Sequence, residues 1–268
     1  MRAGAIRRGP RPAALLLAGV AALALAGCHT TRAKEDLANP DTIYRRASTS
    51  MANGDYGAAT KLFESLNARF PFSDVARQSR LDLMYAYYRQ HEKDSAVDAA
   101  DTFIRENPTH PRIDYAYYIK GLVYFERTPN VLERRFDVDM SKRTPQDARK
   151  SFDAFTRVVT QYPHSEYAPD ARQRMVYLRN RLAEYEINVA HYYMRRGAWV
   201  AALDRARNVI ENYDGAPATR DALELNVAAY QRLGLPELAA DSQKVLETNF
   251  PQDAGARKAA RQHWWKFW

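Results

Sequence analysis

Apolar residues recur every three or four positions along most of residues 41–251, a spacing that places them on one face of a helix. In residues 189–210, an apolar and aromatic run ends in two arginines, and the next run has Ala202 and Ala206 at helical spacing. Gly197 stands between the runs, and glycine adopts the positive φ of a tight turn without a steric penalty. This pattern predicts a helical hairpin, the unit of tetratricopeptide-type repeats.

The end of a second helix is marked five times along the chain, usually by an aromatic residue and in most cases by a following proline. The marks are Phe70-Pro71, Asn107-Pro108, Tyr162-Pro163, Tyr213-Asp214 and Phe250-Pro251, in successive steps of 37, 55, 51 and 37 residues. The short steps are close to the tetratricopeptide period of about 34 residues, and the long steps predict an insertion or extended helices. The predicted hairpins span residues 43–70, 75–106, 113–162 (interrupted at 128–145), 169–212 and 219–249.

A single hairpin is too small to bury its own apolar face, so stacking of neighbouring hairpins has to supply the core. We expect Ala59, Phe63 and Phe155 to belong to this core. The alternation of β-branched and polar residues that is typical of strands is missing. We therefore predict an all-α fold: a tetratricopeptide-like helical-hairpin solenoid of about five repeats in residues 41–251, behind a lipoprotein signal peptide.

Residues 1–27 have the three parts of a lipoprotein signal peptide. Four arginines precede an apolar run at 13–26 that is short for a membrane span, and the run ends in Leu-Ala-Gly before Cys28. This order predicts that Cys28 is lipidated and becomes the new N-terminus; an ordinary signal peptide or an N-terminal anchor with a chance cysteine is the alternative. Residues 28–40 would then form a lipidated tether, and His29 in place of aspartate favours the outer membrane.

Removal of residues 1–27 takes four arginines and no acid from the 40 basic and 32 acidic residues of the chain. The mature protein then has a net charge near +4, with both signs alternating along the predicted helices. Nucleic-acid binding favours a clustered basic stripe, so we expect no nucleic-acid partner. Cys28 is the only cysteine, which excludes an intramolecular disulfide.

Motifs for enzymatic chemistry are missing from the sequence. His91-Glu92 begins like a zinc-protease helix, but Ser95 stands where the second histidine is required. The six histidines have no paired ligand spacing, and we interpret His191 as a packed or solvent-facing residue. We interpret the single helical acids Glu184 and Glu186 as solubilising charges. The sequence therefore predicts neither an enzyme nor a metal or cofactor site.

Tyrosines gather on the first helices of the predicted hairpins. Leu81, Tyr85 and Tyr88 share one helical stripe, and Tyr115 and Tyr118 begin another. In tetratricopeptide repeats the first helices line the inner groove, where tyrosine offers rigid apolar area and a hydroxyl for an extended peptide. The alternative is packing between repeats, which we prefer for Tyr87 and Tyr124 and leave open for the other four tyrosines.

Two segments stand outside the repeat pattern. Residues 252–268 form a basic and aromatic tail with three of the four tryptophans, Trp264, Trp265 and Trp268. Such a tail suits a membrane interface, a partner groove or the client groove itself, where Phe267-Trp268 would mimic the aromatic end of a client. A disordered end is the alternative. Residues 128–145 are either a solvated loop or a partner-contact loop.

Several motifs in the sequence resemble those of the BamD family, the lipoproteins of the outer-membrane β-barrel assembly (BAM) complex. The motifs that carry the resemblance are Leu25–Cys28, Arg69–Phe72, Leu81–Tyr88, Asn107–Pro111, Asp114-Tyr115, Arg195–Ala201 and Ala218–Leu223. They are spread over nearly the whole mature chain; the tail goes beyond the family pattern.

The resemblance implies a non-enzymatic scaffold on the periplasmic face of the outer membrane of a Gram-negative bacterium. Its N-terminal repeats would capture unfolded outer-membrane β-barrel proteins, with Phe70 and Phe72 in the client-binding region. Its C-terminal repeats would dock the periplasmic domains of BamA, with Arg205 in an ion pair, and other BAM lipoproteins would join. Gly57 replaces a larger polar residue of some relatives. The alternative hypothesis is a repeat lipoprotein that scaffolds peptidoglycan enzymes.

Overall fold

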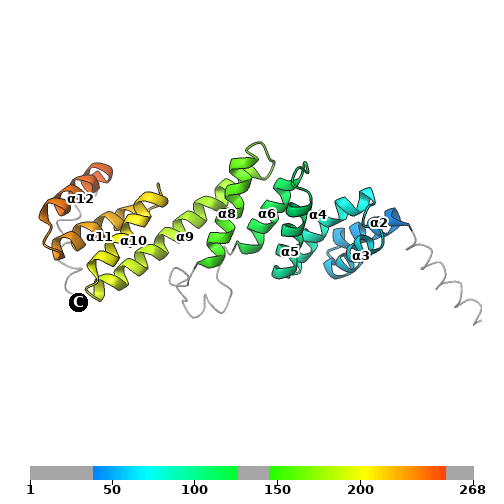
Figure 1. The fold of residues 1–268 in the computed structure, drawn as a ribbon, viewed down its shortest axis with the longest axis horizontal. Helices are drawn as coiled ribbons and strands as arrows, with labels where there is room; N and C mark the ends of the chain where they lie inside the picture. The colour runs from blue at the N-terminus through cyan, green and yellow to red at the C-terminus, as the bar shows by residue number, and fades with distance from the viewer. Residues whose placement is uncertain (1–38, 126–144, 252–268) are drawn as a thin grey trace, which may run out of the picture. The chain divides into compact units, whose positions relative to one another are not determined.

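The computed structural model describes residues 39–125 and 145–251. These residues form ten helices and no strand (Figure 1). The helices are α2 (Pro40–Ala52), α3 (Tyr56–Arg69), α4 (Asp74–Arg89), α5 (Lys93–Glu106), α6 (Ile113–Tyr124), α8 (Gln146–Gln161), α9 (Ala168–Arg195), α10 (Trp199–Asn212), α11 (Ala218–Arg232) and α12 (Pro236–Asn249). The predicted all-α, helical-hairpin fold is confirmed, with helix ends within a few residues of those expected.

The chain divides into two compact units, residues 1–99 and residues 100–268, and α5 crosses the division. The predicted signal peptide with Cys28, most of the predicted insertion at 128–145 and the tail at 252–268 lie outside the described residues.

The turns inside four hairpins share one backbone feature, a residue with positive φ two positions after the first helix ends. Gly54, Gly197 and Gly234 take this position with φ of 80°, 71° and 72°. His91 occupies it in the turn between α4 and α5 with φ of 61°. A residue in the left-handed backbone region terminates a helix, and glycine adopts this region most easily. The three turns with glycine could therefore be predicted from the sequence.

Helices α2, α3 and α4 build the core of the first unit. Phe63 and Ala59 of α3 are fully buried against Ala47 of α2 and Leu83 of α4. Side-chain caps begin each helix: Asn39, Asp55 and Ser73 accept hydrogen bonds from backbone N–H groups of the first turn. Helix α4 also packs against α2, so that first helices of successive hairpins touch.

The 28-residue helix α9 organises the second unit because it serves two hairpins (Figure 1). Leu178 and Leu182 near its midpoint pack against Phe155 and Val158 of α8. Ala183, Ile187 and Ala190 in its second half pack against α10 and α11. Each successive pair of helices from α8 to α12 is in contact.

The contact between α6 and α8 leaves no room for a side chain at Gly121. A Cβ built on Gly121 would lie 2.4–2.8 Å from ring atoms of Phe155, and Phe155 is fully buried. Ser151 Oγ donates a 2.8 Å hydrogen bond to the carbonyl oxygen of Gly121. Glycine is therefore required here by a neighbouring ring, since its backbone is ordinary helix.

We expect Gly121→Ala to lower the free energy of unfolding by about 1–3 kcal/mol, because the added methyl group has to displace the Phe155 ring. Gly57→Ala on α3 is the matched control: its new Cβ would meet Gln90 Oε1 at 3.6 Å, an ordinary contact. That control should be neutral or stabilising, since alanine is the better helix former. Urea denaturation of both variants tests the expectation, and equal stabilities would contradict it.

Candidate functional site

Tyr56, Tyr85, Tyr88 and Arg89 form an aromatic group in the first unit, here called the Tyr85 cluster. The rings of Tyr56 and Tyr85 meet edge to face with centroids 6.2 Å apart, and Tyr88 lies 6.2 Å from Tyr85. Their helices bring them together: Tyr56 begins α3, and the other three residues end α4. The three tyrosines are partly exposed and Arg89 is exposed.

The guanidinium of Arg89 is held within this cluster by the tyrosines. It lies 4.5 Å from the centroid of the Tyr56 ring and 5.5 Å from that of Tyr85. Arg89 Nη1 also donates a 2.7 Å hydrogen bond to the Tyr85 hydroxyl, and this bond raises the pKa of Arg89. The cluster thus offers ring faces beside a fixed positive charge, a combination that fits an apolar group next to a carboxylate. Neither Tyr56 nor Arg89 was among the predicted site residues.

Phe70 and Phe72 belong to the turn between α3 and α4. Phe70 caps the C-terminal end of α3, and its carbonyl oxygen accepts hydrogen bonds from the backbone N–H and the hydroxyl of Ser73. Arg80 donates a hydrogen bond to the carbonyl oxygen of Pro71. Within this braced turn Phe72 is 96% exposed, whereas Phe70 is partly buried. An aromatic side chain so exposed on a fixed turn is available to a partner.

The two predicted tyrosines of the second unit are engaged in packing. Tyr118 stacks on Tyr167 with centroids 4.7 Å apart, and its hydroxyl donates a 2.7 Å hydrogen bond to Asp170. Burial, followed by this hydrogen bond, raises the pKa of Tyr118 to about 12. Tyr115 lies 5.4 Å from Tyr167 and under the guanidinium of Arg112. One ring face and the hydroxyl of Tyr118 are therefore occupied within the unit.

Tyr87 and Tyr124, for which we preferred packing, are packed. Tyr87 lies against the core of the first unit and donates a 2.5 Å hydrogen bond to Glu64. Tyr124 is 8% exposed. The stripe of tyrosines thus divides: the Tyr85 cluster carries partly exposed rings beside a cation, and the tyrosines of α6 hold helices together.

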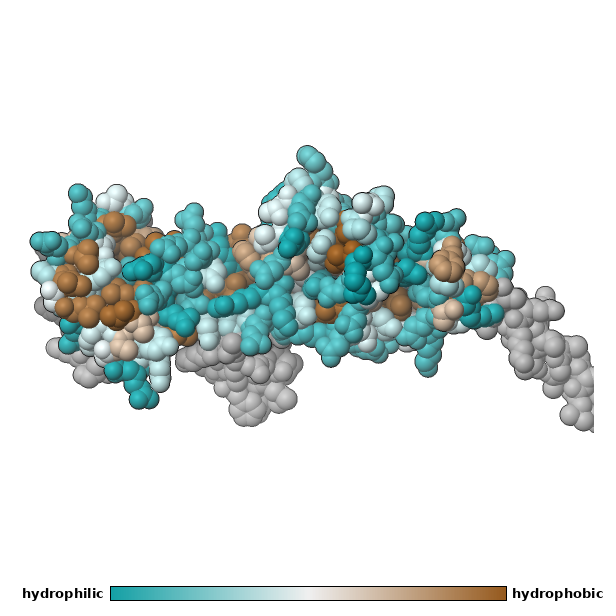
Figure 2. All heavy atoms as spheres, in the orientation of Figure 1, coloured by the Kyte–Doolittle hydropathy of each residue, from teal (hydrophilic) through white to brown (hydrophobic). Residues whose placement is uncertain are grey.

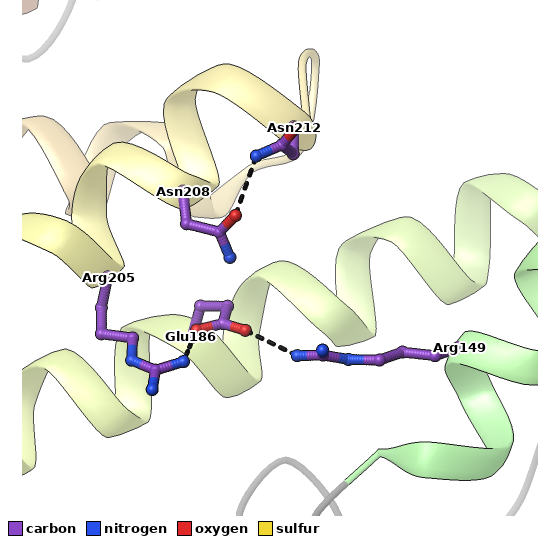
Figure 3. Close-up of polar contacts among 5 residues, drawn as sticks. All are labelled: Arg149, Glu186, Arg205, Asn208 and Asn212. Atoms are coloured by element: carbon purple, nitrogen blue, oxygen red, sulfur yellow. Dashed lines mark hydrogen bonds and ion pairs between the residues drawn. The ribbon is translucent and has the colours of Figure 1, made fainter.

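Glu186 is a buried charge, and our interpretation of it as a solubilising residue is wrong. Its side chain is 1% exposed in the middle of α9. Glu186 Oε1 accepts a hydrogen bond from Arg149 Nη2 at 2.8 Å, and Oε2 accepts one from Arg205 Nη1 at 2.9 Å. Figure 3 shows the two arginines reaching the carboxylate from opposite sides. Glu184, by contrast, is exposed as expected.

The Glu186 ion pairs join three helices, because Arg149 belongs to α8, Glu186 to α9 and Arg205 to α10. A buried carboxylate needs such partners, since both of its oxygens have lost water. The arginine side chains are 53% and 40% exposed, so each also reaches the surface. The hydrogen bond to Glu186 raises the pKa of Arg205. Arg205 was predicted to bind a partner, and the structure gives it a structural role in the ion pair with Glu186; its contact with a partner stays a prediction.

We expect Glu186→Gln to lower the free energy of unfolding by about 1–3 kcal/mol, because the neutral amide loses both ion pairs and its nitrogen cannot accept a hydrogen bond from an arginine. Glu184→Gln, two residues away and exposed, should change it by less than about 0.5 kcal/mol. Chemical denaturation of the two variants measures the difference. A Glu186→Gln protein as stable as Glu184→Gln would refute a stabilising role for these ion pairs.

Chemistry-bearing groups are sparse in the part of the chain that the structure describes. Within residues 39–125 and 145–251, no three His, Cys, Asp or Glu side chains are grouped to hold a metal ion. His191 is a partly buried residue of α9, and burial lowers its pKa. In the same ranges we find no helix with the length and apolarity of a membrane span.

The fold and the exposed aromatic surface define an all-α protein of helical-hairpin repeats with candidate binding surfaces. Residues 37–246 match the YfiO family, described as "Outer membrane lipoprotein". The chain is 42% identical over 231 residues to the outer membrane protein assembly factor BamD of Neisseria meningitidis serogroup A, covering 85% of this chain and 86% of the relative. It belongs to this family, that of the BamD lipoproteins.

Other relatives extend over even more of their own length. The BamD of Neisseria gonorrhoeae is 40% identical over 263 residues, covering 95% of this chain and 98% of the relative. That of Vibrio cholerae is 34% identical over 234 residues, covering 87% and 97%. Among solved structures, the crystal structure of MamA matches 81% of this chain and 94% of the MamA chain, with a TM-score of 0.32 and 17% sequence identity.

Proposed function

We propose that this protein is a non-enzymatic scaffold of the outer-membrane β-barrel assembly machinery, which captures unfolded barrel proteins and docks BamA. The observation that carries the proposal is family membership: relatives that match over 85% or more of their length are named outer membrane protein assembly factors. Purification of the native protein with its bound partners tests it. Barrel-assembly subunits support the proposal, and peptidoglycan synthases or hydrolases would favour the alternative scaffold.

The first unit is the proposed client receptor. Its Tyr85 cluster combines ring faces with the Arg89 guanidinium, and Phe72 stands exposed on a turn of the same unit. An unfolded barrel segment that ends in an aromatic residue has an apolar side chain beside a terminal carboxylate. The rings would pack on the side chain and Arg89 would pair with the carboxylate, so the C-terminus of the client is the part recognised.

We expect Phe72→Ala and Tyr85→Ala each to weaken binding of a peptide with an aromatic C-terminus by about tenfold, because each removes an aromatic contact. Phe72→Ala should leave stability unchanged, since that side chain is almost fully solvated. Fluorescence anisotropy with a labelled peptide measures the affinity. Tyr192→Ala removes another exposed aromatic, in the second unit, and is the control that should bind normally.

Arg89→Gln separates the role of the cation from that of the rings. The unsubstituted protein should prefer the free-acid peptide to the same peptide with an amidated C-terminus. The variant should lose this preference and keep the affinity for the amide. Equal binding of the acid and the amide by the unsubstituted protein would show that Arg89 does not contact the carboxylate. The Phe72→Ala and Tyr85→Ala variants would still test the aromatic contacts.

The second unit is the proposed BamA-docking unit, with Arg205 at its centre. Arg205 pairs with Glu186 and still exposes two fifths of its side chain, so it can present further N–H donors to an acidic partner. Arg205→Glu is a poor test of this role because it would place a second carboxylate beside buried Glu186. Arg149 makes the equivalent bond to the other oxygen of Glu186, and it provides a matched control.

We therefore expect Arg205→Gln to reduce BamA recovery in a pull-down by several-fold more than Arg149→Gln, although both variants lose one ion pair to Glu186. Thermal melts should show a similar loss of stability for the two proteins. An equal reduction of BamA recovery by both substitutions would mean that Arg205 acts only through the fold.

Lipidation of Cys28 would tether the scaffold to the periplasmic face of the outer membrane, where client proteins and the other BAM lipoproteins also reside. Several acyl chains on one residue provide the hydrophobic area that stable anchoring requires. Metabolic labelling with palmitate, comparing the natural chain with Cys28→Ala, tests the anchor. Label that persists after the substitution would disprove lipidation at Cys28.

A further inference from the structure

The first and last described helices differ on the sides that face away from their hairpins. The exposed residues of α2 are Asp41, Arg45, Arg46, Thr49 and Ala52, none of which is large and hydrophobic. Helix α12, by contrast, exposes large hydrophobic residues among its polar ones: its N-cap Leu235 and its residues Leu238 and Val245 are 43%, 44% and 46% exposed. Only Ala239 and Leu246 of α12 are recorded as buried. In Figure 2, hydrophobic side chains gather on the visible face where Figure 1 places α11 and α12.

We call Leu235, Leu238 and Val245 the α12 stripe. Leu238 and Val245 are seven residues apart, two helical turns, and therefore share a face. Repeat arrays need a polar outer face on their terminal helices to remain soluble. Helix α2 meets this requirement fully, whereas α12 interrupts its polar surface with the stripe, and this difference favours a further segment that covers the stripe.

We propose that residues 252–268 of the same chain dock on the α12 stripe as the terminal cap of the repeats. The segment begins next to α12, because Pro251 directly follows the residue that ends the helix. Residues 252–263 span about 18 Å as a helix and about 40 Å when extended, and α12 is about 21 Å long. The aromatic residues beyond position 263 can therefore reach the whole stripe in either conformation.

The chemistry of the segment matches that of the stripe. Its last five residues include Trp264, Trp265, Phe267 and Trp268, which supply the apolar area that the stripe lacks. Four basic residues and one acid precede or accompany them, whereas α12 has three acids and one lysine. Attachment to the same chain also gives the segment a millimolar effective concentration, so weak contacts are enough.

The acids of α12 favour this occupant over a bilayer. Asp241 lies between Leu238 and Val245 on the same face, and Glu237 is adjacent to Leu238. Both side chains are exposed. Carboxylates within an apolar stripe oppose approach to an anionic membrane surface, and they pair well with the basic residues of the segment.

Tryptophan accessibility tests the docking in the mature chain, residues 28–268, with Cys28→Ser to remove the lipid and Trp199→Phe to leave only the tail tryptophans fluorescent. The docked indoles should emit at short wavelength and resist acrylamide quenching. Leu238→Gln with Val245→Gln should increase the quenching constant about twofold, because undocked indoles are open to the quencher. Val176→Gln, at an exposed valine of α9, is the matched control and should change nothing.

Hydrogen exchange provides a second measurement that does not depend on tryptophan. Deletion of residues 252–268 should speed exchange in α12 and leave α2 unchanged. Quenching that is already complete in the parent chain, or unaffected by the double substitution, would overturn the proposal. So would protection that appears only with phosphatidylglycerol vesicles, or that disappears on dilution, since the occupant would then be a membrane or a second copy.

Discussion

A single helical hairpin cannot bury all of its apolar surface between its own two helices. The structure therefore depends on how helices of neighbouring hairpins cover the rest. Small residues permit close approach: Ala202 and Ala206 are fully buried on α10, and Gly121 allows Phe155 to lie against the backbone of α6. Helix α9 goes further by contributing to two clusters along its length. The energetic unit is therefore the contact between hairpins rather than the hairpin itself.

Glu186 is the polar exception within this apolar packing. A hydrophobic residue at that position would pack in the core without a partner. The buried carboxylate has lost its water and is stabilised by Arg149 and Arg205 on the flanking helices. Because both arginines also reach the surface, the arrangement fixes two guanidinium groups at defined places on the second unit. The buried acid thus links the packing of α8, α9 and α10 to the charge that a partner would meet.

Most of the fold could be predicted because its signals are local. The turn at Gly197, the prolines after four of the five second helices and the apolar spacing around Phe63 and Phe155 depend only on nearby residues. The positive φ of His91 was not predicted, because no glycine occupies that position, although the turn itself was expected. Sequence spacing also grouped the tyrosines by stripe, but it did not distinguish Tyr118, whose hydroxyl finds Asp170 fifty-two residues away.

The errors in the site arise from contacts between distant parts of the chain. Glu186 follows Leu182 and Ala183 on the buried face of α9, so its position in the stripe did carry a signal of burial. Its partners come from other helices, and no local pattern names them. Arg89 was likewise missed because the rings that hold it belong to two helices. Charges that look solvated in a sequence acquire fixed contacts when an adjacent helix brings a ring or an opposite charge. Helical spacing therefore locates the faces, and tertiary packing decides their chemistry.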